Sequence, residues 1–254
     1  MTVEPIGPYA IRQFKIDILV PLSLFGHDVS FTASSQAMLT TAIVVGGYLT
    51  WATRDMKIIP GRLQMSAEYV HTFVEDTIVR FGGLEAKRTL PFFLTMFVFL
   101  LFGSLIGLTP IKFTFTSHVI VTFALAIAVF VYVNFLAFKT QGLGFFRFFL
   151  PTGTPVYIAP LIVVIELVSY FFRPITLGLR IFANILAGHI MLKLFGDFCA
   201  ILTDTYGATG AVAAVVPLAA MVLMYFVEVG VMLIQSYIFV VLSAIYVKDA
   251  LHGH

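Results

Sequence analysis

Long apolar runs, separated by short polar segments, make up most of the chain. Three of them have close to the roughly 20 residues that a helix needs to cross a hydrocarbon core about 30 Å thick. These three runs lie at residues 36–53, 90–109 and 117–138. The pattern therefore predicts three upright transmembrane helices in the first part of the chain.

Two further apolar runs, at 156–197 and 209–247, are much longer and are separated by the turn-like sequence DTYGATG at 204–210. Fully helical, each would be roughly 60 Å long, about twice the thickness of the hydrocarbon core. We therefore expect a long helical hairpin that tilts steeply or bends. Thr154 followed by Pro155 predicts where its first helix begins, as a capping residue followed by proline.

A segment of a different kind, at 61–81, lies between the first and second runs. It carries several charges, and its apolar residues recur at steps of three and four, which predicts an amphipathic helix in the plane of the interface. These apolar residues are Leu63, Ala67, Val70, Val74, Ile78 and Phe81. We interpret residues 1–35 as a segment at the membrane surface, because Asp17 and Pro21 interrupt the short apolar run that a signal peptide would need.

Composition supports one class of protein. Of the 254 residues, 60% are hydrophobic and only 11% are charged, whereas about a quarter are charged in soluble domains. The net charge of +2 and the scattered basic residues do not favour nucleic-acid binding. The single Cys199 excludes a disulfide framework, and we expect no metal site and no cofactor. We predict an all-α integral membrane protein forming a single domain over 1–254.

The distribution of cations predicts the orientation. Loops expected on one side of the membrane carry most of the lysines and arginines: Arg54, Lys57, Arg62, Arg80, Lys87, Arg88, Lys139 and Arg147. The other side has Arg12, Lys15 and Lys112. By the positive-inside rule the N-terminus lies outside and the C-terminus lies in the cytoplasm.

Arg180 lies near the middle of the first long helix. An arginine at the bilayer centre costs at least about 2.5–3.5 kcal/mol, and its own chain offers no carboxylate one helical turn away. We therefore expect its partner to come from another molecule. Ala183 and Ala187, on the same face, would let another helix approach closely, although ordinary packing within the chain explains them equally well.

Other polar residues are arranged along the two long helices. Glu166 lies about 21 Å toward the inside of Arg180, and His189 lies about 13 Å toward the outside. Arg173 and Asn184 share the face of Arg180. We interpret Glu166, His189 and Glu228 as a pathway for ions, because ionisable residues inside spans are rare and usually functional. Asn184 and Gln235 are equally well explained as hydrogen-bonding residues that hold helices together.

Three sequences together resemble the subunit a family of rotary F-type ATP synthases: PTGTPVYIAPLIVVIELVSYFFRP, PITLGLRIFANILAGHIML and VEVGVMLIQSYIFVVLSAIYVKDA. Arg180, Asn184, the Gly188–His189 pair, Glu228 and Gln235 all occur at the spacing of this family. Many bacterial members carry Glu where this chain has His189 and His where it has Glu228. The arrangement here resembles the mitochondrial and alphaproteobacterial members.

The resemblance implies a stator subunit that forms two offset proton half-channels against a ring of c subunits and so drives rotation. Arg180 would face the ring carboxylate, His189 and Glu228 would relay protons from the outside, and Glu166 would line the path to the inside. Gln235, Asn184 and Arg173 would be supporting polar residues. The implied partners are the c-ring, the peripheral-stalk b-type subunits, the remaining ATP synthase subunits and the lipid bilayer, and the chain would not be an enzyme by itself.

Alternative classes predict different sequences. A self-contained ion channel or secondary transporter would also bury charges, but it should show repeated halves or matching broken helices. A membrane enzyme would need a motif such as HExxH or GxSxG, and the chain has neither. We expect a bacterial inner membrane as the location, with the mitochondrial inner membrane as the alternative.

Overall fold

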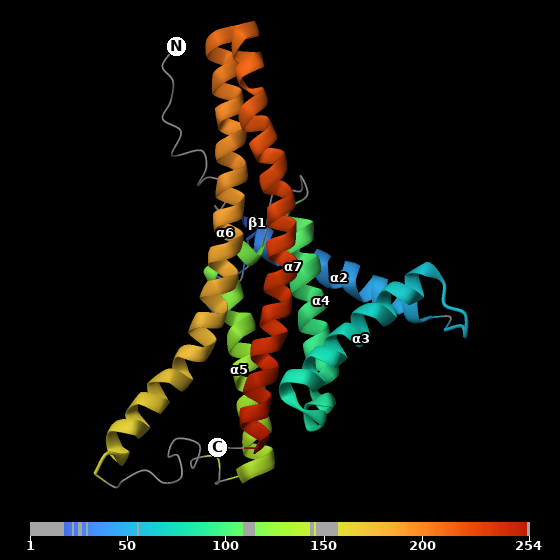
Figure 1. Ribbon diagram of the computed structural model, residues 1–254, viewed down its shortest axis with the longest axis vertical. Helices are drawn as coiled ribbons and strands as arrows, with labels where there is room; N and C mark the ends of the chain where they lie inside the picture. Colours follow the sequence, from blue (N-terminus) through green and yellow to red (C-terminus); the bar gives the residue numbers. More distant parts are fainter. Residues whose placement is uncertain are drawn as a thin grey trace.

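The computed structural model describes residues 18–21, 23–24, 27–28, 30–54, 56–108, 115–142, 145 and 157–252. Long helices dominate this part of the chain (Figure 1), as the apolar runs predict. The α-helices are α2 (Ala33–Thr53), α3 (Arg62–Gly82), α4 (Leu90–Gly107), α5 (Val119–Gln141), α6 (Ala159–Ala213) and α7 (Val215–His252). Two short 3₁₀ helices, η1 (Leu84–Thr89) and η2 (Phe115–Ser117), precede α4 and α5. The predicted all-helical membrane fold is confirmed.

Among the residues described before α2 there are four very short strands, which the sequence did not predict. β1 (Ile18–Val20) pairs antiparallel with β4 (Phe31–Thr32), and β2 (Ser23–Leu24) pairs antiparallel with β3 (His27–Asp28). The Thr32 side chain then caps α2 by accepting a hydrogen bond from the backbone N–H of Ser35 at 3.4 Å. Residues 1–17, 22, 25, 26 and 29 of the predicted surface segment lie outside the described residues.

Four described helices are long and apolar enough to cross a membrane: Leu84–Gly107, Val119–Gln141, Ala159–Ala213 and Val215–Leu251. They correspond to the second and third predicted spans and to the two long helices. The first predicted span does form a helix, α2, of 21 residues, but it is not among the four, because residues such as Gln36 and Thr40 dilute its apolar character. In Figure 1, α2 runs across the common direction of α6 and α7. Its crossing of the membrane stays a prediction.

The amphipathic helix at 61–81 appears as α3, one residue shifted. Val74 and Ile78 are fully buried, as the apolar face predicts, whereas Leu63 at the start of the same face is 44% exposed. The buried apolar positions therefore lie in the C-terminal half of α3, where Phe73 contacts Phe97 of α4 and Tyr237 of α7. The Glu75 carboxylate accepts a hydrogen bond from Lys87 of η1, with 2.5 Å between Nζ and Oε1. This bond lowers the pKa of the Glu75 carboxyl.

Both helices of the long hairpin extend past their predicted ends. α6 begins at Ala159, with Pro160 in its first turn, whereas the predicted start at Thr154 and Pro155 lies outside the described residues. The helix also continues past residue 197 and breaks at Gly207, inside the predicted turn DTYGATG, with φ 58° and ψ −129°, a conformation that glycine adopts readily. A short helical piece then leads into α7, which ends at His252 and not near 247.

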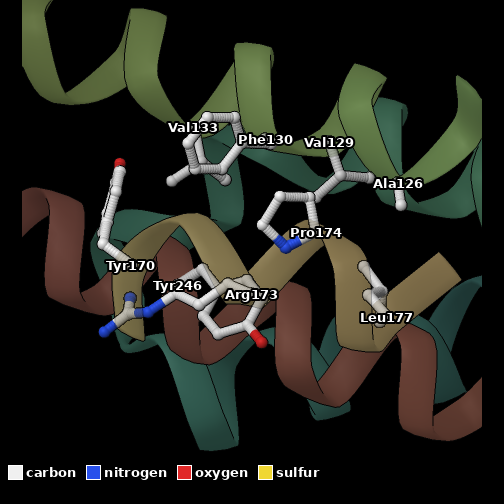
Figure 2. A pocket seen from close by; sticks show the side chains of 9 residues that line it. All are labelled: Ala126, Val129, Phe130, Val133, Tyr170, Arg173, Pro174, Leu177 and Tyr246. Carbon is white, nitrogen blue, oxygen red and sulfur yellow. The ribbon is translucent and has the colours of Figure 1, made fainter. Parts of the chain in front are cut away.

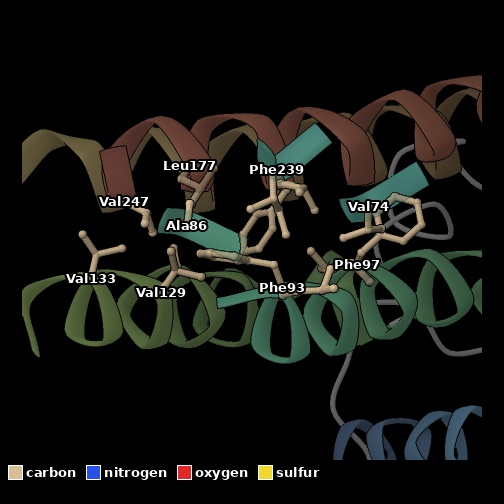
Figure 3. Close-up of a cluster of buried hydrophobic side chains, with 14 of the residues drawn as sticks. Val74, Ala86, Phe93, Phe97, Val129, Val133, Leu177, Phe239 and Val247 are labelled. Atoms are coloured by element: carbon tan, nitrogen blue, oxygen red, sulfur yellow. The ribbon is translucent and has the colours of Figure 1, made fainter. Parts of the chain in front are cut away.

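The apolar core lies where α3, α4 and α5 pack on one side of the α6–α7 hairpin. Phe93 and Phe97 of α4, Val129 of α5, Leu177 of α6 and Phe239 of α7 meet there (Figure 3). α6 approaches α5 closely at Gly178, where a Cβ atom would lie 3.3 Å from the backbone of Phe123.

The other side of the hairpin carries exposed apolar side chains. They include Phe172, Leu179 and Met191 of α6 and Leu223 and Phe226 of α7. One face of the hairpin is thus covered by the chain itself, and the other is open.

Candidate functional site

Arg180 lies on the open face of α6. Its side chain is exposed, as are those of Thr176, Ala183 and Ala187, which share the same helical face. Within the residues that the structure describes, no carboxylate lies within 4.0 Å of the Arg180 guanidinium. The structure therefore places a cation and small neighbouring side chains on a surface that its own helices leave uncovered.

An amide pair ties the two long helices together one turn beyond Arg180. Asn184 Nδ2 donates a hydrogen bond to Gln235 Oε1 at 2.8 Å, and Gln235 is 5% exposed. The Gln235 Nε2 group has no hydrogen-bond partner among the described residues. The sequence left a structural and a functional reading open for these amides. The hydrogen bond between Asn184 and Gln235 supports the structural reading, because it holds α6 and α7 in register beside Arg180.

His189 and Glu228 meet between the same two helices. His189 Nε2 lies 3.9 Å from Glu228 Oε1, which is too long for a hydrogen bond. Glu228 is 2% exposed, and neither of its carboxyl oxygens has a hydrogen-bond partner in the described part of the chain. A small movement of either side chain, or one bridging water molecule, would connect His189 and Glu228 by hydrogen bonds. The two residues therefore form a buried titratable pair.

Gly188 makes room for this pair. A Cβ atom at position 188 would lie 2.6 Å from Glu228 Oε1 and 2.7 Å from its Cδ, closer than real Cβ contacts allow. Steric exclusion by the Glu228 carboxyl thus explains why position 188 is a glycine. Only a residue without a side chain lets the Glu228 carboxyl lie against the α6 backbone.

Glu166 lies apart from the other ionisable residues. It is half-buried, 14 residues before Arg180 and 23 before His189, which corresponds to about 21 Å and about 34 Å along a straight helix. The order along α6 is therefore Glu166, Arg180 and then the His189–Glu228 pair. The structure brings His189 and Glu228 together and leaves Glu166 at a distance on the other side of Arg180.

Arg173 has partners that the sequence did not predict. Its Nη1 atom lies 3.0 Å from Asp249 Oδ2 of α7, and its guanidinium carbon lies 5.3 Å from the Tyr170 ring centroid and 5.0 Å from that of Tyr246. Figure 2 shows Arg173 and Tyr246 side by side next to Pro174. We expected Arg173 to be a supporting residue near Arg180, and the structure adds an ion pair with its own chain.

Asp249 escaped prediction because the second long helix was expected to end at 247, which placed this acid in the C-terminal tail. α7 continues past it to His252. Tyr170 also donates a hydrogen bond from its hydroxyl to Asn134 Oδ1 of α5 at 2.8 Å, which links α5 to the same cluster. The sequence offered one signal for this cluster: Tyr170 and Arg173 are three residues apart and therefore lie on one helix face.

The fold and the site first define a class. This is a polytopic helical membrane protein with ionisable side chains inside its spans, an arrangement typical of proteins that move ions. A comparison with family models then gives the particular assignment. The ATP synthase A chain family matches residues 35–248, and the chain belongs to this family.

Curated relatives agree with the family assignment. The chain is 41% identical over 252 residues to ATP synthase subunit a of Parvibaculum lavamentivorans, covering 98% of this chain and 95% of the relative. It is 42% identical over 247 residues to ATP synthase subunit a of Paramagnetospirillum magneticum, covering 96% and 98% of the two chains. The corresponding protein of Acidiphilium cryptum is 40% identical over 252 residues, with 98% of each covered. The resemblance drawn from the sequence motifs is thereby confirmed.

Proposed function

We propose that this chain is the stator subunit a of an ATP synthase membrane sector and passes protons to and from the carboxylates of a c-subunit ring. Arg180 is the observation that carries the proposal. It is a permanent cation inside a long apolar helix, exposed on the uncovered face of the hairpin, with no acidic partner among the described residues. The negative charge it requires comes from the rotor.

Arginine suits this role because it does not deprotonate in proteins. It cannot hand a proton on, so it blocks a direct leak between two half-channels while attracting a deprotonated ring carboxylate. At about 4 Å and an effective dielectric near 20, the attraction is about 4 kcal/mol before desolvation is subtracted. That is enough to favour the ionised carboxylate and weak enough to release it as the ring turns.

His189 and Glu228 form the relay on the outer side of Arg180. The imidazole of His189 can accept and release a proton, and the buried carboxyl lies 3.9 Å away, so a proton can pass between them through a small displacement or a water molecule. Glu166 lines the path to the inside. The inner and outer half-channels are offset because Glu166 and His189 lie on opposite sides of Arg180 along α6.

The remaining assignments follow from this role. The N-terminus lies outside and the C-terminus in the cytoplasm of a bacterial inner membrane, in keeping with relatives from bacteria. The c-ring covers the open face of the α6–α7 hairpin, and peripheral-stalk b-type subunits and the rest of the synthase complete the assembly. The chain moves protons and leaves the chemistry of ATP to other subunits.

Replacing Arg180 with alanine in assembled complexes tests the proposal. We expect Arg180→Ala to abolish coupled ATP synthesis in membrane vesicles and to open a proton leak, because the barrier between the half-channels is gone. Arg62→Ala, which removes an exposed arginine of α3, serves as the matched control and should leave synthesis near wild type. Normal synthesis by Arg180→Ala complexes that contain the full ring would contradict the proposed function.

A further inference from the structure

α6 carries a second arginine, which the proposed proton path does not use. Arg173 is 20% exposed and its ion-pair partner Asp249 is 22% exposed, with 3.0 Å between the guanidinium nitrogen and the carboxyl oxygen. The rings of Tyr170 and Tyr246 lie 5.3 Å and 5.0 Å from the guanidinium carbon. The charge of Arg173 is therefore neutralised and enclosed by its own chain, in contrast to that of Arg180.

The two arginines are close enough to compete. They are seven residues apart, which is about two helical turns, about 10 Å along the axis and nearly the same face. Tyr246 of α7 lies near both guanidinium groups and near Asp249. A ring carboxylate that approaches Arg180 along this face therefore comes within range of Arg173 as well.

We propose that Asp249 is a positioning residue that neutralises Arg173, so that the rotor carboxylate meets Arg180 and not the arginine two turns away. This inference rests on the proposed function of Arg180. Without Asp249, Arg173 would offer the carboxylate a second attractive position on the inner side of Arg180. The ring carboxylate would then bind at either Arg173 or Arg180, and proton transfer between the half-channels would slow.

A purely mechanical role makes a different prediction. If the Arg173–Asp249 pair served only to clasp α6 to α7, a single replacement would leave a half-buried charge unpaired and would lower the amount of assembled complex. If the pair serves to balance charge beside Arg180, each single replacement lowers synthesis while subunit a and the ring stay at wild-type amounts, and the double replacement restores synthesis. Synthesis per assembled complex therefore separates the two roles.

The experiment compares Asp249→Asn, Arg173→Gln and the double variant Arg173→Gln/Asp249→Asn in vesicles that contain the complete synthase. The readouts are ATP synthesis driven by an imposed proton gradient and the amounts of subunit a and ring in the purified complex. Asp249→Glu keeps the charge and should retain activity. Asp204→Asn removes an exposed acid from the far end of α6 and should remain near wild type.

We expect Asp249→Asn to lower synthesis about tenfold, which is the effect of a unit charge about 10 Å away at an effective dielectric near 20. Arg173→Gln should also be impaired, because the released Asp249 carboxylate would attract Arg180. The double variant should recover to within about twofold of wild type. If Asp249→Asn does not assemble, the comparison of Arg173→Gln with the double variant decides the same question.

Two outcomes would overturn the inference: wild-type synthesis by Asp249→Asn, or a double variant as impaired as the single ones. Neither outcome touches the role of Arg180, because Arg180→Ala is measured in the same vesicles. Normal synthesis by Arg180→Ala would instead remove the proposed function on which the inference rests.

Discussion

At the scale of single residues, the missing side chain of Gly188 matters as much as the charged groups beside it. Glu228 lies almost completely buried against the α6 backbone, 3.9 Å from His189, and any Cβ at position 188 would occupy the space of its carboxyl. In a helix glycine costs about 1 kcal/mol relative to alanine. Position 188 accepts that cost because the Glu228 carboxyl needs the space.

Gly188→Ala should therefore slow proton flow. The added methyl group must push the Glu228 carboxyl away from His189, and a misplacement of about 1 Å can reduce transfer rates by up to about 100-fold. Passive proton flow through the membrane sector in vesicles measures the effect. Asp is one methylene shorter than Glu, so Gly188→Ala/Glu228→Asp should recover part of the flow.

Gly196→Ala is the matched control on the same helix. A Cβ at position 196 would find only Met221 Sδ, at 3.8 Å, so alanine fits there without displacement. We expect unchanged proton flow for this variant. Equal losses in Gly188→Ala and Gly196→Ala would mean that the Glu228 carboxyl does not depend on the space at Gly188.

Much of the site can be predicted from residue chemistry, and the exceptions have physical reasons. Arg180, His189 and Glu228 stand out because ionisable residues inside apolar runs are rare. Asp249 does not stand out, because an acid just beyond a run looks like a solvated loop residue until α7 is known to reach His252. The Asn184–Gln235 bond joins residues 51 apart in sequence, and helical periodicity fixes the face of each residue but not which faces meet.

At the scale of helices, polar bonds fix how α6 sits against its neighbours. Tyr170 bonds Asn134 of α5, while Arg173 and Asn184 bond Asp249 and Gln235 of α7. Apolar side chains give little directional preference in lipid, because the lipid tails are equally apolar. We therefore attribute the register of α6, and with it the placement of Arg180, largely to these three bonds.

Tyr170→Phe should destabilise the contact between α5 and α6. It removes the 2.8 Å bond to Asn134 Oδ1 while keeping the ring, and hydrogen bonds between membrane helices contribute on average about 0.6 kcal/mol. Thermal unfolding of the complex in detergent measures the loss. Tyr69→Phe, at a position 73% exposed on α3, is the control and should leave the midpoint unchanged. An unchanged midpoint in both variants would mean that the bond contributes nothing.

The break in α6 depends on one backbone conformation. Gly207 has φ 58°, and a Cβ there would meet nothing within 4 Å, so the cost of alanine at 207 comes from the backbone alone. We expect Gly207→Ala to destabilise the protein by about 1–3 kcal/mol, measured by thermal unfolding. Gly47→Ala, in α2 with equally open space, should change stability in the opposite direction by up to about 1 kcal/mol. Stability changes of the same sign in Gly207→Ala and Gly47→Ala would refute this explanation of the break.

Element boundaries show where prediction from sequence stops. Apolar length predicted the helices of the second and third spans and of the hairpin, because burial in lipid requires continuous helical hydrogen bonding. The turn-like DTYGATG predicted where the helix breaks, since Gly207 lies inside it, but apolar length did not predict that the helix extends beyond residue 197 as far as this break. The exposure of Leu63 was also unexpected, because a helical wheel cannot say how much of an apolar face its own chain covers.

At the scale of the whole molecule, the α6–α7 hairpin has two unlike sides. Helices α3, α4 and α5 cover one side with a packed apolar core, and the other side presents Arg180, small residues and exposed apolar side chains (Figures 1 and 3). A cation left on an uncovered apolar surface is incompletely solvated unless a partner brings a negative charge. This uncovered cation supports the proposal that the ring of another subunit covers the open side.

A structure of the assembled membrane sector by cryo-electron microscopy tests this central claim most directly. We expect the ring to lie against the open face of α6 and α7, with one ring carboxylate within about 4 Å of the Arg180 guanidinium. A structure in which an acid of the same chain neutralises Arg180, or in which Arg180 faces lipid away from the ring, would contradict the account.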